Sequence, residues 1–408
     1  MPNLANYDKS NQIEITQLTI EKPSLNSDNK QILDITALMD QFIIYEDLMQ
    51  NSISARLIFR DQVNLVGTLP IVGGETVTIK YRTPIYDDFI TQKFMVGQVG
   101  ERVIANDSSN MQMNQLMLCT PEVWWAVNND MNSAYQGTYT EIITKLFNEI
   151  KTDKKILDTE DSLGINAYVA PSISVFKAIK FCAGRANTKS SSAMFFWESI
   201  KGYHIKSLKA IYDTELVKTV YIEDRAISGI NNDAEKVFNS VYSYEYLSSN
   251  NRIRQFEQAS FSDINVMVDL TNARIIKINN TYENTADKLG IKLGKFKLND
   301  DAKSIRDKDD VYMPFRKDLS HLTQFTKDSN IDLMDNLALL INIPGDSGLK
   351  AGDIIYMDIP SREGTEITTE KFSSGKWLVR SIKSLIGKTT YSQVCEIVKD
   401  SFETEVRE

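Results

Sequence analysis

Residues 45–81, YEDLMQNSISARLIFRDQVNLVGTLPIVGGETVTIKY, decide how this chain folds. Two segments within them alternate between apolar and polar residues with a period of two, which is typical of half-buried β-strands. The first segment has one apolar face, made of Ile53, Ala55, Leu57 and Phe59. The second has another, made of Val77, Ile79 and Tyr81. Between them lie Asp61, Pro70 and the Gly73-Gly74 pair, so we predict two strands joined by a connection rather than by a catalytic loop.

A second group of strand signals lies near the C-terminus, in INIPGDSGLKAGDIIYMDIP (341–360) and SSGKWLVRSIKSLIGKTTYSQVCEIVKD (373–400). Gly348, Gly352 and Asp353 predict a turn that leads into a strand over 354–359. Gly375 precedes a strand over 377–382, and a third strand follows over 390–398. The closing part of the chain is therefore predicted to be a β-meander.

The middle of the chain changes to a helical period. One apolar stripe at helical spacing consists of Tyr139, Ile142, Ile143, Leu146, Phe147 and Ile150. Thr138 is a candidate N-cap for this helix, and a second helix is predicted to begin near Ser174. The apolar run AMFFW (193–197) predicts a buried strand, and residues 319–340 predict a further helix. Further strands are predicted over 94–103, 112–118, 218–222 and 237–246.

Three of these segments, in the same order along the chain, resemble the baseplate central hub proteins of contractile-tailed, T-even-like bacteriophages. Residues 45–81 look like the first tube-like domain of these proteins. The segments GINAYVAPSISVFKAIKFCAGRAN (164–187) and SSAMFFWESIKGYHIKSL (191–208) look like the helix and the aromatic strand of the family. The closing meander is similar to the end of the second tube-like domain, and also to the N-terminal hub part of type VI secretion spike proteins.

The resemblance implies an α+β fold with two tube-like antiparallel β-barrel or sandwich domains and inserted smaller mixed α/β domains. We expect the first tube-like domain at residues 1–120 and a helical or mixed domain at 121–205. The second tube-like domain is expected at 206–255 and 325–400, with a small mixed domain inserted at 256–324. Two such β-rich units suggest an internal duplication, and only the resemblance carries that suggestion.

The function that the resemblance implies is structural, not enzymatic. Three copies would assemble so that their six tube-like domains form a pseudo-sixfold ring, which joins the sixfold tail tube to the threefold central spike. The implied partners are the other two copies, the spike protein, the tail tube protein, the tape-measure protein and the baseplate wedge proteins. DNA would pass through the channel without specific binding. The protein would reside in the tail baseplate of the virion after assembly in the host cytoplasm.

Composition agrees with a soluble globular protein of more than one domain. The 408 residues are 42% hydrophobic and 25% charged, and no apolar run is as long as a membrane span. The N-terminus lacks the basic and apolar parts of a signal peptide. A net charge of −9 argues against a protein that grips nucleic acid through a basic face, and an acidic channel wall would repel passing DNA.

No residue is predicted to be catalytic, cofactor-binding or metal-binding. Cys119, Cys182 and Cys395 are far apart in apolar contexts, and we expect buried thiols. The acidic run at 307–310 lacks the glycine and the glutamate of a calcium loop. Gly73-Gly74-Glu75 and 345–348 lack the order of a phosphate loop and are predicted to be hairpin turns. His204 and His321 are the two histidines, and we expect structural roles for both.

Two other functions stay open at this stage. A tail-tip peptidoglycan hydrolase is the main alternative, because many Asp and Glu residues could supply a pair of catalytic carboxylates. A receptor-binding module is disfavoured because the chain has neither fibrous repeats nor a coiled coil. The aromatic residues Trp124, Trp125, Tyr242, Tyr244 and Tyr246 are interpreted as core or protein-interface residues.

Overall fold

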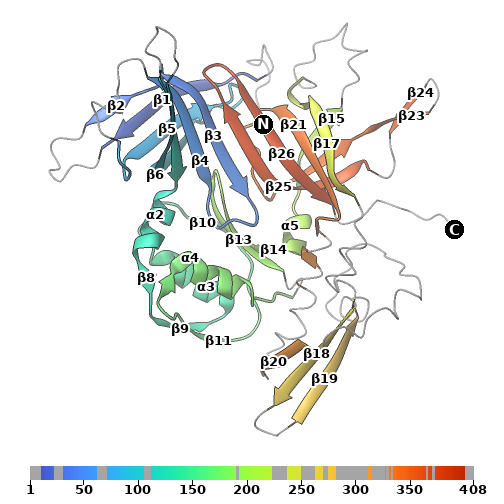
Figure 1. Cartoon of the computed structure of the whole chain (residues 1–408). Coiled ribbons are helices and arrows are strands. Elements are labelled where there is room, and N and C mark those ends of the chain that lie inside the picture. The colour runs from blue at the N-terminus through green and yellow to red at the C-terminus, as the bar shows by residue number, and fades with distance from the viewer. Residues whose placement is uncertain are drawn as a thin grey trace.

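The structure, a computed structural model, describes residues 11–22, 31–61, 71–104, 112–189, 193–222, 237–249, 262–269, 274–281, 311–314, 327, 330–331, 334–363, 366–369 and 373–399. Strands dominate these residues, and most of the strands join one large, mainly antiparallel sheet (Figure 1). The helices are short and gather in residues 121–212, beside the sheet (Figure 1). The described part of the chain is therefore β-rich.

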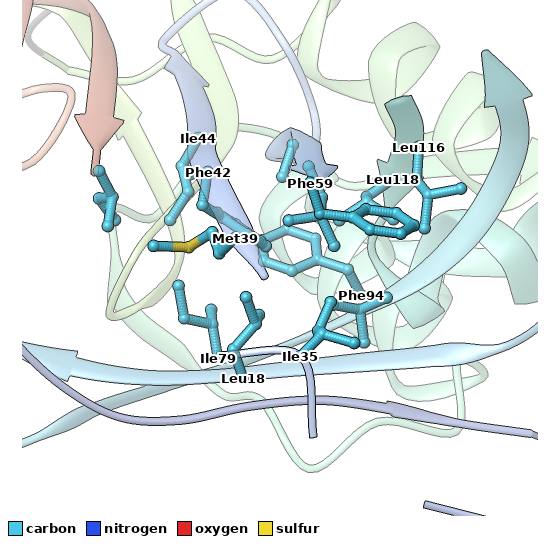
Figure 2. Close-up of a cluster of buried hydrophobic side chains, with 14 of the residues drawn as sticks. Leu18, Ile35, Met39, Phe42, Ile44, Phe59, Ile79, Phe94, Leu116 and Leu118 are labelled. Carbon is cyan, nitrogen blue, oxygen red and sulfur yellow. The ribbon is translucent and has the colours of Figure 1, made fainter. Parts of the chain in front are cut away.

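The N-terminal strands are β1 (Glu14–Glu21), β2 (Ile32–Asp34), β3 (Met39–Asp47), β4 (Ser54–Asp61), β5 (Thr76–Arg82), β6 (Ile90–Ile104) and β7 (Gln112–Cys119). They pair in the order β3-β4-β7-β6-β5-β1-β2, and every pair is antiparallel. The predicted alternation is confirmed on β4 and β5, whose inward faces bury Ala55, Leu57, Phe59, Val77, Ile79 and Tyr81. The sheet curves around a core in which side chains from distant strands meet, such as Leu18, Phe42, Phe94 and Leu116 (Figure 2).

The middle section has helices α2 (Pro121–Asn128), α3 (Tyr139–Asn148), α4 (Val175–Ala183) and α5 (Leu208–Tyr212). Its strands are β8 (Asp130–Met131), β9 (Ala134–Gly137), β10 (Ile156–Thr159), β11 (Asn166–Val169), β12 (Ile173–Ser174), β13 (Met194–Ser199) and β14 (Gly202–Ser207). The predicted N-cap is confirmed, because Thr138 and Glu141 form a reciprocal capping box at the start of α3. The predicted strand at 193–197 is β13, and all of its residues are buried.

The C-terminal half supplies β15 (Leu216–Ile222), β16 (Ser240–Val241), β17 (Ser243–Ser249), β21 (Leu337–Pro344), β22 (Ile354–Asp358), β25 (Gly375–Ile386) and β26 (Tyr391–Lys399) to the same sheet. The strands predicted over 354–359, 377–382 and 390–398 are therefore confirmed. A separate sheet holds β18 (Ser262–Asp269), β19 (Arg274–Thr281) and β20 (Val311–Pro314). A two-stranded ribbon holds β23 (Pro360–Glu363) and β24 (Glu366–Thr369).

The helix predicted over 319–340 is wrong at its C-terminal end. The described residues 327, 330, 331 and 334 are helical, but the chain turns at Asn336 and residues 337–340 open strand β21. The apolar run LALLI fits either a helix or a strand by periodicity alone, and pairing with β17 and β26 decides for the strand. The acidic run at 307–310 and His321 lie outside the described residues.

The same order of five antiparallel strands occurs twice in the sheet. In the first motif the order is β3-β4-β7-β6-β5, and in the second it is β17-β21-β26-β25-β22. Each strand of one motif has a counterpart at the same place in the chain order of the other. The strand that adjoins the last strand of each motif differs in direction. β1 is antiparallel to β5, whereas β15 is parallel to β22.

The turn that opens the last strand of this order is also repeated in detail. Gly74 has a φ of 87° and donates its N–H to the carbonyl of Val96 at 2.8 Å. Gly352 has a φ of 91° and donates to the carbonyl of Val379, also at 2.8 Å. In both turns the next residue is acidic, and its backbone carbonyl accepts the N–H of the same valine. These positive φ angles explain why both turns need glycine.

Candidate assembly interface

The two five-strand motifs meet edge to edge through β3 and β25. Residues 42–47 of β3 pair with residues 381–386 of β25 in an antiparallel ladder of six residue pairs. The first part of β25 uses the same edge to pair with β22, and its other edge pairs with β26. β25 is therefore the strand that makes one sheet of the two motifs.

The hairpin formed by β25 and β26 contributes to the cores of both motifs. Ile386 and Tyr391, near its tip, belong to the hydrophobic cluster of the first motif. Trp377, Ile382 and Cys395 belong to the cluster of the second. Because the hairpin is buried on both sides of the junction, separating the motifs would expose both cores to water.

Glu46 is buried at this junction, where its side chain is 1% exposed. Its Oε2 accepts a hydrogen bond from the N–H of Ile200 at 3.0 Å, and its Oε1 has no hydrogen-bond partner among the described residues. Burial raises the pKa of the Glu46 carboxyl to about 8, and the charges of Asp353 and Glu198 add to the effect. The carboxyl is therefore mostly protonated at neutral pH.

A second buried polar group ties the helical section to the first motif. Lys154 Nζ lies 2.5 Å from Glu198 Oε1 and 3.2 Å from Glu122 Oε2. The other oxygen of Glu198 accepts hydrogen bonds from Ser52 Oγ at 2.8 Å, from the N–H of Ile53 at 3.1 Å and from Tyr203 Oη at 3.1 Å. Burial lowers the pKa of the Lys154 ammonium, but the two carboxylates outweigh it and the pKa is raised. These hydrogen bonds and the ion pair connect Glu198 of the helical section to Ser52 and Ile53 of the first motif, so we assign its carboxylate a structural role.

The structure brings Ser199, His204 and Asp158 together, a grouping that the sequence analysis did not find. His204 Nε2 lies 3.0 Å from Ser199 Oγ, and His204 Nδ1 lies 3.0 Å from Asp158 Oδ2. These distances match the order of a Ser-His-Asp triad. In the β13–β14 hairpin Ser199 lies opposite Gly202 and His204 lies opposite Trp197, so Ser199 and His204 are diagonal neighbours, whereas Asp158 comes from β10. No spacing rule in the sequence could have signalled the third residue.

Burial makes this grouping a structural one. Ser199 and His204 are each 1% exposed, and the Ser199 hydroxyl also contacts the carbonyl of Gly202 at 3.1 Å and the N–H of Lys201 at 3.2 Å. The His204 ring stacks on Trp197 with 4.9 Å between centroids. Burial lowers the pKa of His204 to about 4, so the ring is neutral at pH 7. The three side chains therefore stabilise the turn between β13 and β14.

The remaining candidates from the sequence lie in turns, cores and surfaces. Glu75 accepts hydrogen bonds from the N–H groups of Val72 and Gly73 at 2.9 Å, so Gly73-Gly74-Glu75 closes its own turn. Cys182 and Cys395 are buried as predicted, whereas Cys119 is only half-buried. No three His, Cys, Asp or Glu side chains of the described ranges gather as a metal site. In the same ranges, no helix is long and apolar enough to cross a membrane.

The predicted tyrosine face is confirmed in part. Tyr244 and Tyr246 share one face of β17, with 6.2 Å between their ring centroids. They are 42% and 45% exposed. Tyr242 lies outside the strand, and its hydroxyl is 3.2 Å from Asn11 Oδ1. Trp124 is 37% exposed, and Trp125 packs against the core of the helical section.

Comparison with solved structures places this fold among tail proteins. The chain matches a tail protein from Neisseria meningitidis MC58 with a TM-score of 0.53 at 10% identity, over 94% of this chain and 96% of that one. It matches the 43 kDa tail protein of prophage MuSo2 from Shewanella oneidensis with a TM-score of 0.52 at 10% identity, over 94% and 98%. A chain of the lidded Francisella PdpA–VgrG complex gives 0.52 at 8% identity, over 98% of this chain and 55% of that one.

These matches confirm the resemblance seen in the sequence at the level of fold. No protein-family model matches the chain, and no curated protein sequence matches it. At about one identical residue in ten, the likeness lies in the arrangement of strands and helices. The chain therefore has a fold that it shares with phage tail proteins and with a chain of the PdpA–VgrG complex.

Proposed function

We propose that this chain is a structural hub protein of the baseplate of a contractile phage tail. Three copies form a ring in which two similar β-rich domains per chain give pseudo-sixfold symmetry. Such a ring joins a sixfold tail tube to a threefold central spike and leaves a channel for genome ejection. The observation that carries the proposal is the repeated five-strand motif, joined edge to edge within one chain by β3 and β25.

The domain limits of this proposal follow the sequence expectation. The two tube-like domains comprise residues 1–120, and 206–255 with 325–400. The helical domain at 121–205 and the small domain at 256–324 lie outside the ring wall. Three hydrophobic clusters support this division, because one is built mainly from residues 18–118, one from 126–205 and one from 220–397, while a fourth packs residues from 193–211 against residues from 334–398.

The proposed partners are the spike, the tail tube, the tape-measure protein and the wedge proteins. The likeness to a chain of the PdpA–VgrG complex, whose name records an assembly with a second protein, supports a spike-like partner. The net charge of −9 suits a wall past which DNA moves without sticking. The protein is located in the virion tail after assembly in the host cytoplasm.

The first test is the mass of the purified chain in solution, measured by light scattering coupled to size exclusion. The expected mass is about 139 kDa, three times the 46.4 kDa of one chain. Electron microscopy of the same sample is expected to show a ring with a central pore. A chain that stays monomeric, or that forms an even-numbered oligomer, would contradict the proposed trimer.

The alternative function, a tail-tip peptidoglycan hydrolase, has one observation in its favour, which is the Ser199–His204–Asp158 grouping. The burial of Ser199 speaks against it, because a substrate carbonyl must reach the nucleophile. A turbidity assay on purified cell walls tests it directly. Clearing that is lost in Ser199→Ala, with folding retained, would establish the hydrolase and overturn the purely structural proposal.

A further inference from the structure

β17 and part of β6 each have an edge that no described strand of the large sheet pairs with, as do the short end strands β2 and β16. β17 pairs with β21 on one side only. β6 pairs with β5 through residues 90–95 and with β7 through 95–104, so residues 98–104 have one unpaired edge among the described strands. Unpaired edges present rows of N–H and C=O groups that favour pairing with another chain.

β17 and β6 are the counterparts of the pair that joins the motifs within the chain. β17 occupies in the second motif the place of β3 in the first, and β6 occupies in the first motif the place of β25 in the second. β3 and β25 pair with each other, whereas β17 and β6 do not. Each chain therefore completes one such junction, between β3 and β25. It leaves the two halves of a second junction, β17 and β6, unpaired with each other.

β6 and β25 share a bulge at the start of this edge. In β25 the register shifts between Val379 and Ser381, and the ladder with β3 begins at Ser381. In β6 the register shifts between Val96 and Gln98, directly before the residues with the unpaired edge, and it shifts a second time between Val99 and Arg102. Since a bulge bends its strand and turns its edge, the shared bulge turns both strands alike where this edge begins, and the second bulge adds one residue to β6 before Arg102.

The side chains of β17 match the position of a strand that lacks its neighbour. Phe42 of β3 lies opposite Leu57, and Tyr244 of β17 lies opposite Ile341, the counterpart of Leu57. Both partners are fully buried, so Phe42 and Tyr244 point to the core side of their motifs. Phe42 is 0% exposed, however, whereas Tyr244 is 42% exposed.

Tyr246 repeats this difference. It lies opposite Leu339, while its counterpart Ile44 lies opposite Ala55. Ile44 is 0% exposed and Tyr246 is 45% exposed. The tyrosines are therefore core-facing aromatic side chains at the open side of a motif, and they have a hydroxyl that suits an interface.

We propose that β17 of one copy pairs antiparallel with residues 98–104 of β6 in the next copy, repeating between chains the ladder that β3 and β25 make within a chain. The contact is head-to-tail, because two different surfaces meet, and such a contact gives a ring when the rotation from copy to copy closes. The number of copies in the ring rests on the proposed function, whereas the identity of the two strands rests on the repeated motif.

The repeated register gives the residues that face each other across this interface. Ser384 of β25 lies opposite Gln393 of β26 and opposite Ile44 of β3. The counterpart of Ser384 is Arg102, which lies opposite Asn114 of β7. Arg102 therefore lies beside Tyr246 of the neighbouring copy, and Val103 lies beside Glu245.

The first test replaces both tyrosines of β17. Tyr244→Lys/Tyr246→Lys is expected to shift the mass in solution from that of the ring to that of one chain, because an edge lysine opposes strand pairing. The matched control is Tyr221→Lys on β15, since Tyr221 is 41% exposed but lies outside the proposed interface. Thermal unfolding of each variant separates loss of pairing from loss of folding.

The second test traps the contact itself. The single variants Glu245→Cys and Val103→Cys are purified separately and oxidised with oxidised glutathione, alone and as a mixture. A disulfide-linked pair is expected in the mixture at a yield at least about tenfold above that of either variant alone, since the paired Cα atoms of an antiparallel ladder lie within disulfide reach. Cross-linking also captures an association too weak to survive size exclusion.

The outcomes separate this inference from the proposed function. A ring that persists in the double lysine variant, with no cross-link in the mixture, would overturn the strand assignment and leave the hub proposal standing. Cross-linking of Glu245→Cys alone would indicate that two β17 strands pair with each other in a dimer, which contradicts both. A cross-link in the mixture, together with a wild-type mass that is not a trimer, would support the interface and overturn the trimer.

Discussion

The two five-strand motifs of this chain differ most at the strand that begins each of them. β3 has a strand on both sides, since it pairs with β4 and with β25. β17 has β21 alone among the described strands. The core-facing side chains follow this difference, because Phe42 and Ile44 are fully buried while Tyr244 and Tyr246 are nearly half exposed. The same position in a repeated motif is thus core in one copy and surface in the other.

This contrast teaches how a repeat within one chain can serve assembly. The pairing of β3 with β25 is complete within the chain. We expect the proposed pairing of β17 with β6 between copies to have the same geometry. A protein of this design needs no second type of interface to form a ring, because the pairing of β3 with β25 provides the template. The predictions below test whether the two motifs are as equivalent as their strand order.

The largest expected effect compares Phe42→Ala with Tyr244→Ala. Phe42→Ala removes a fully buried ring and is expected to lower the free energy of unfolding by about 3–5 kcal/mol. Tyr244→Ala should lower it by less than about 1 kcal/mol in the isolated chain, because the ring is already partly in water. Urea unfolding at low protein concentration measures both. Equal losses would show that β17 is as well covered as β3.

The next comparison concerns the two glycine turns. An added Cβ at Gly352 would lie 2.7 Å from Trp197 Cζ2, and one at Gly74 would lie 3.5 Å from Trp124 Cζ2. Both substitutions to alanine strain a positive φ, at a cost of about 1–2 kcal/mol. Gly352→Ala adds a clash with a buried ring, so a total of about 3 kcal/mol is expected. Thermal unfolding should rank Gly352→Ala clearly below Gly74→Ala, and the reverse order would contradict this account.

The third prediction uses Glu46, which lies at the junction between β3 and β25. Its folded pKa is about 8 and the ordinary value is 4.5, so the folded chain binds more protons between these two values. Its contribution to stability is therefore fully present below about pH 4.5 and is lost as the pH rises through about 8.

Glu46→Gln cannot ionise and should remove this pH dependence. From the shift between 4.5 and about 8, we expect the advantage of the variant over the wild type in free energy of unfolding to be about 3 kcal/mol larger at pH 8 than near pH 5. Unfolding in urea across this range measures the gap between the two proteins. Curves that stay parallel from pH 5 to pH 9 would show that the Glu46 carboxyl is not protonated in the folded chain.

The smallest expected effect is that of Ser199→Ala. The hydroxyl makes contacts with Gly202, Lys201 and His204, so its loss should cost about 1 kcal/mol. Its counterpart for comparison is Thr138→Ala, which removes the cap of α3 and should cost a similar amount. Thermal unfolding measures both. A large loss for Ser199→Ala alone would mean that the Ser199–His204–Asp158 group organises more than its own turn.

Much of the fold could be predicted from local patterns. The alternation on β4 and β5, the stripe of α3 with its Thr138 cap, and the glycine turns before β22 and β25 all have signals within a few residues. Residues 337–340 had no such signal, because an apolar run suits a helix and a buried strand equally. The Ser199–His204–Asp158 group and the Glu198–Lys154 pair were missed because Asp158 and Lys154 lie far along the chain from their partners.

The sequence by itself determined many of the strands and turns and which family the chain resembles, since each of these depends on residues close together. Only the tertiary structure decided that the five-strand order is repeated, that β3 and β25 join the two motifs, and that β17 and part of β6 each have one edge unpaired among the described strands. Strand pairing is made by backbone groups, which are the same in every residue. For that reason the side-chain pattern specifies a strand and its faces, while its neighbours are chosen by the packing of the whole chain.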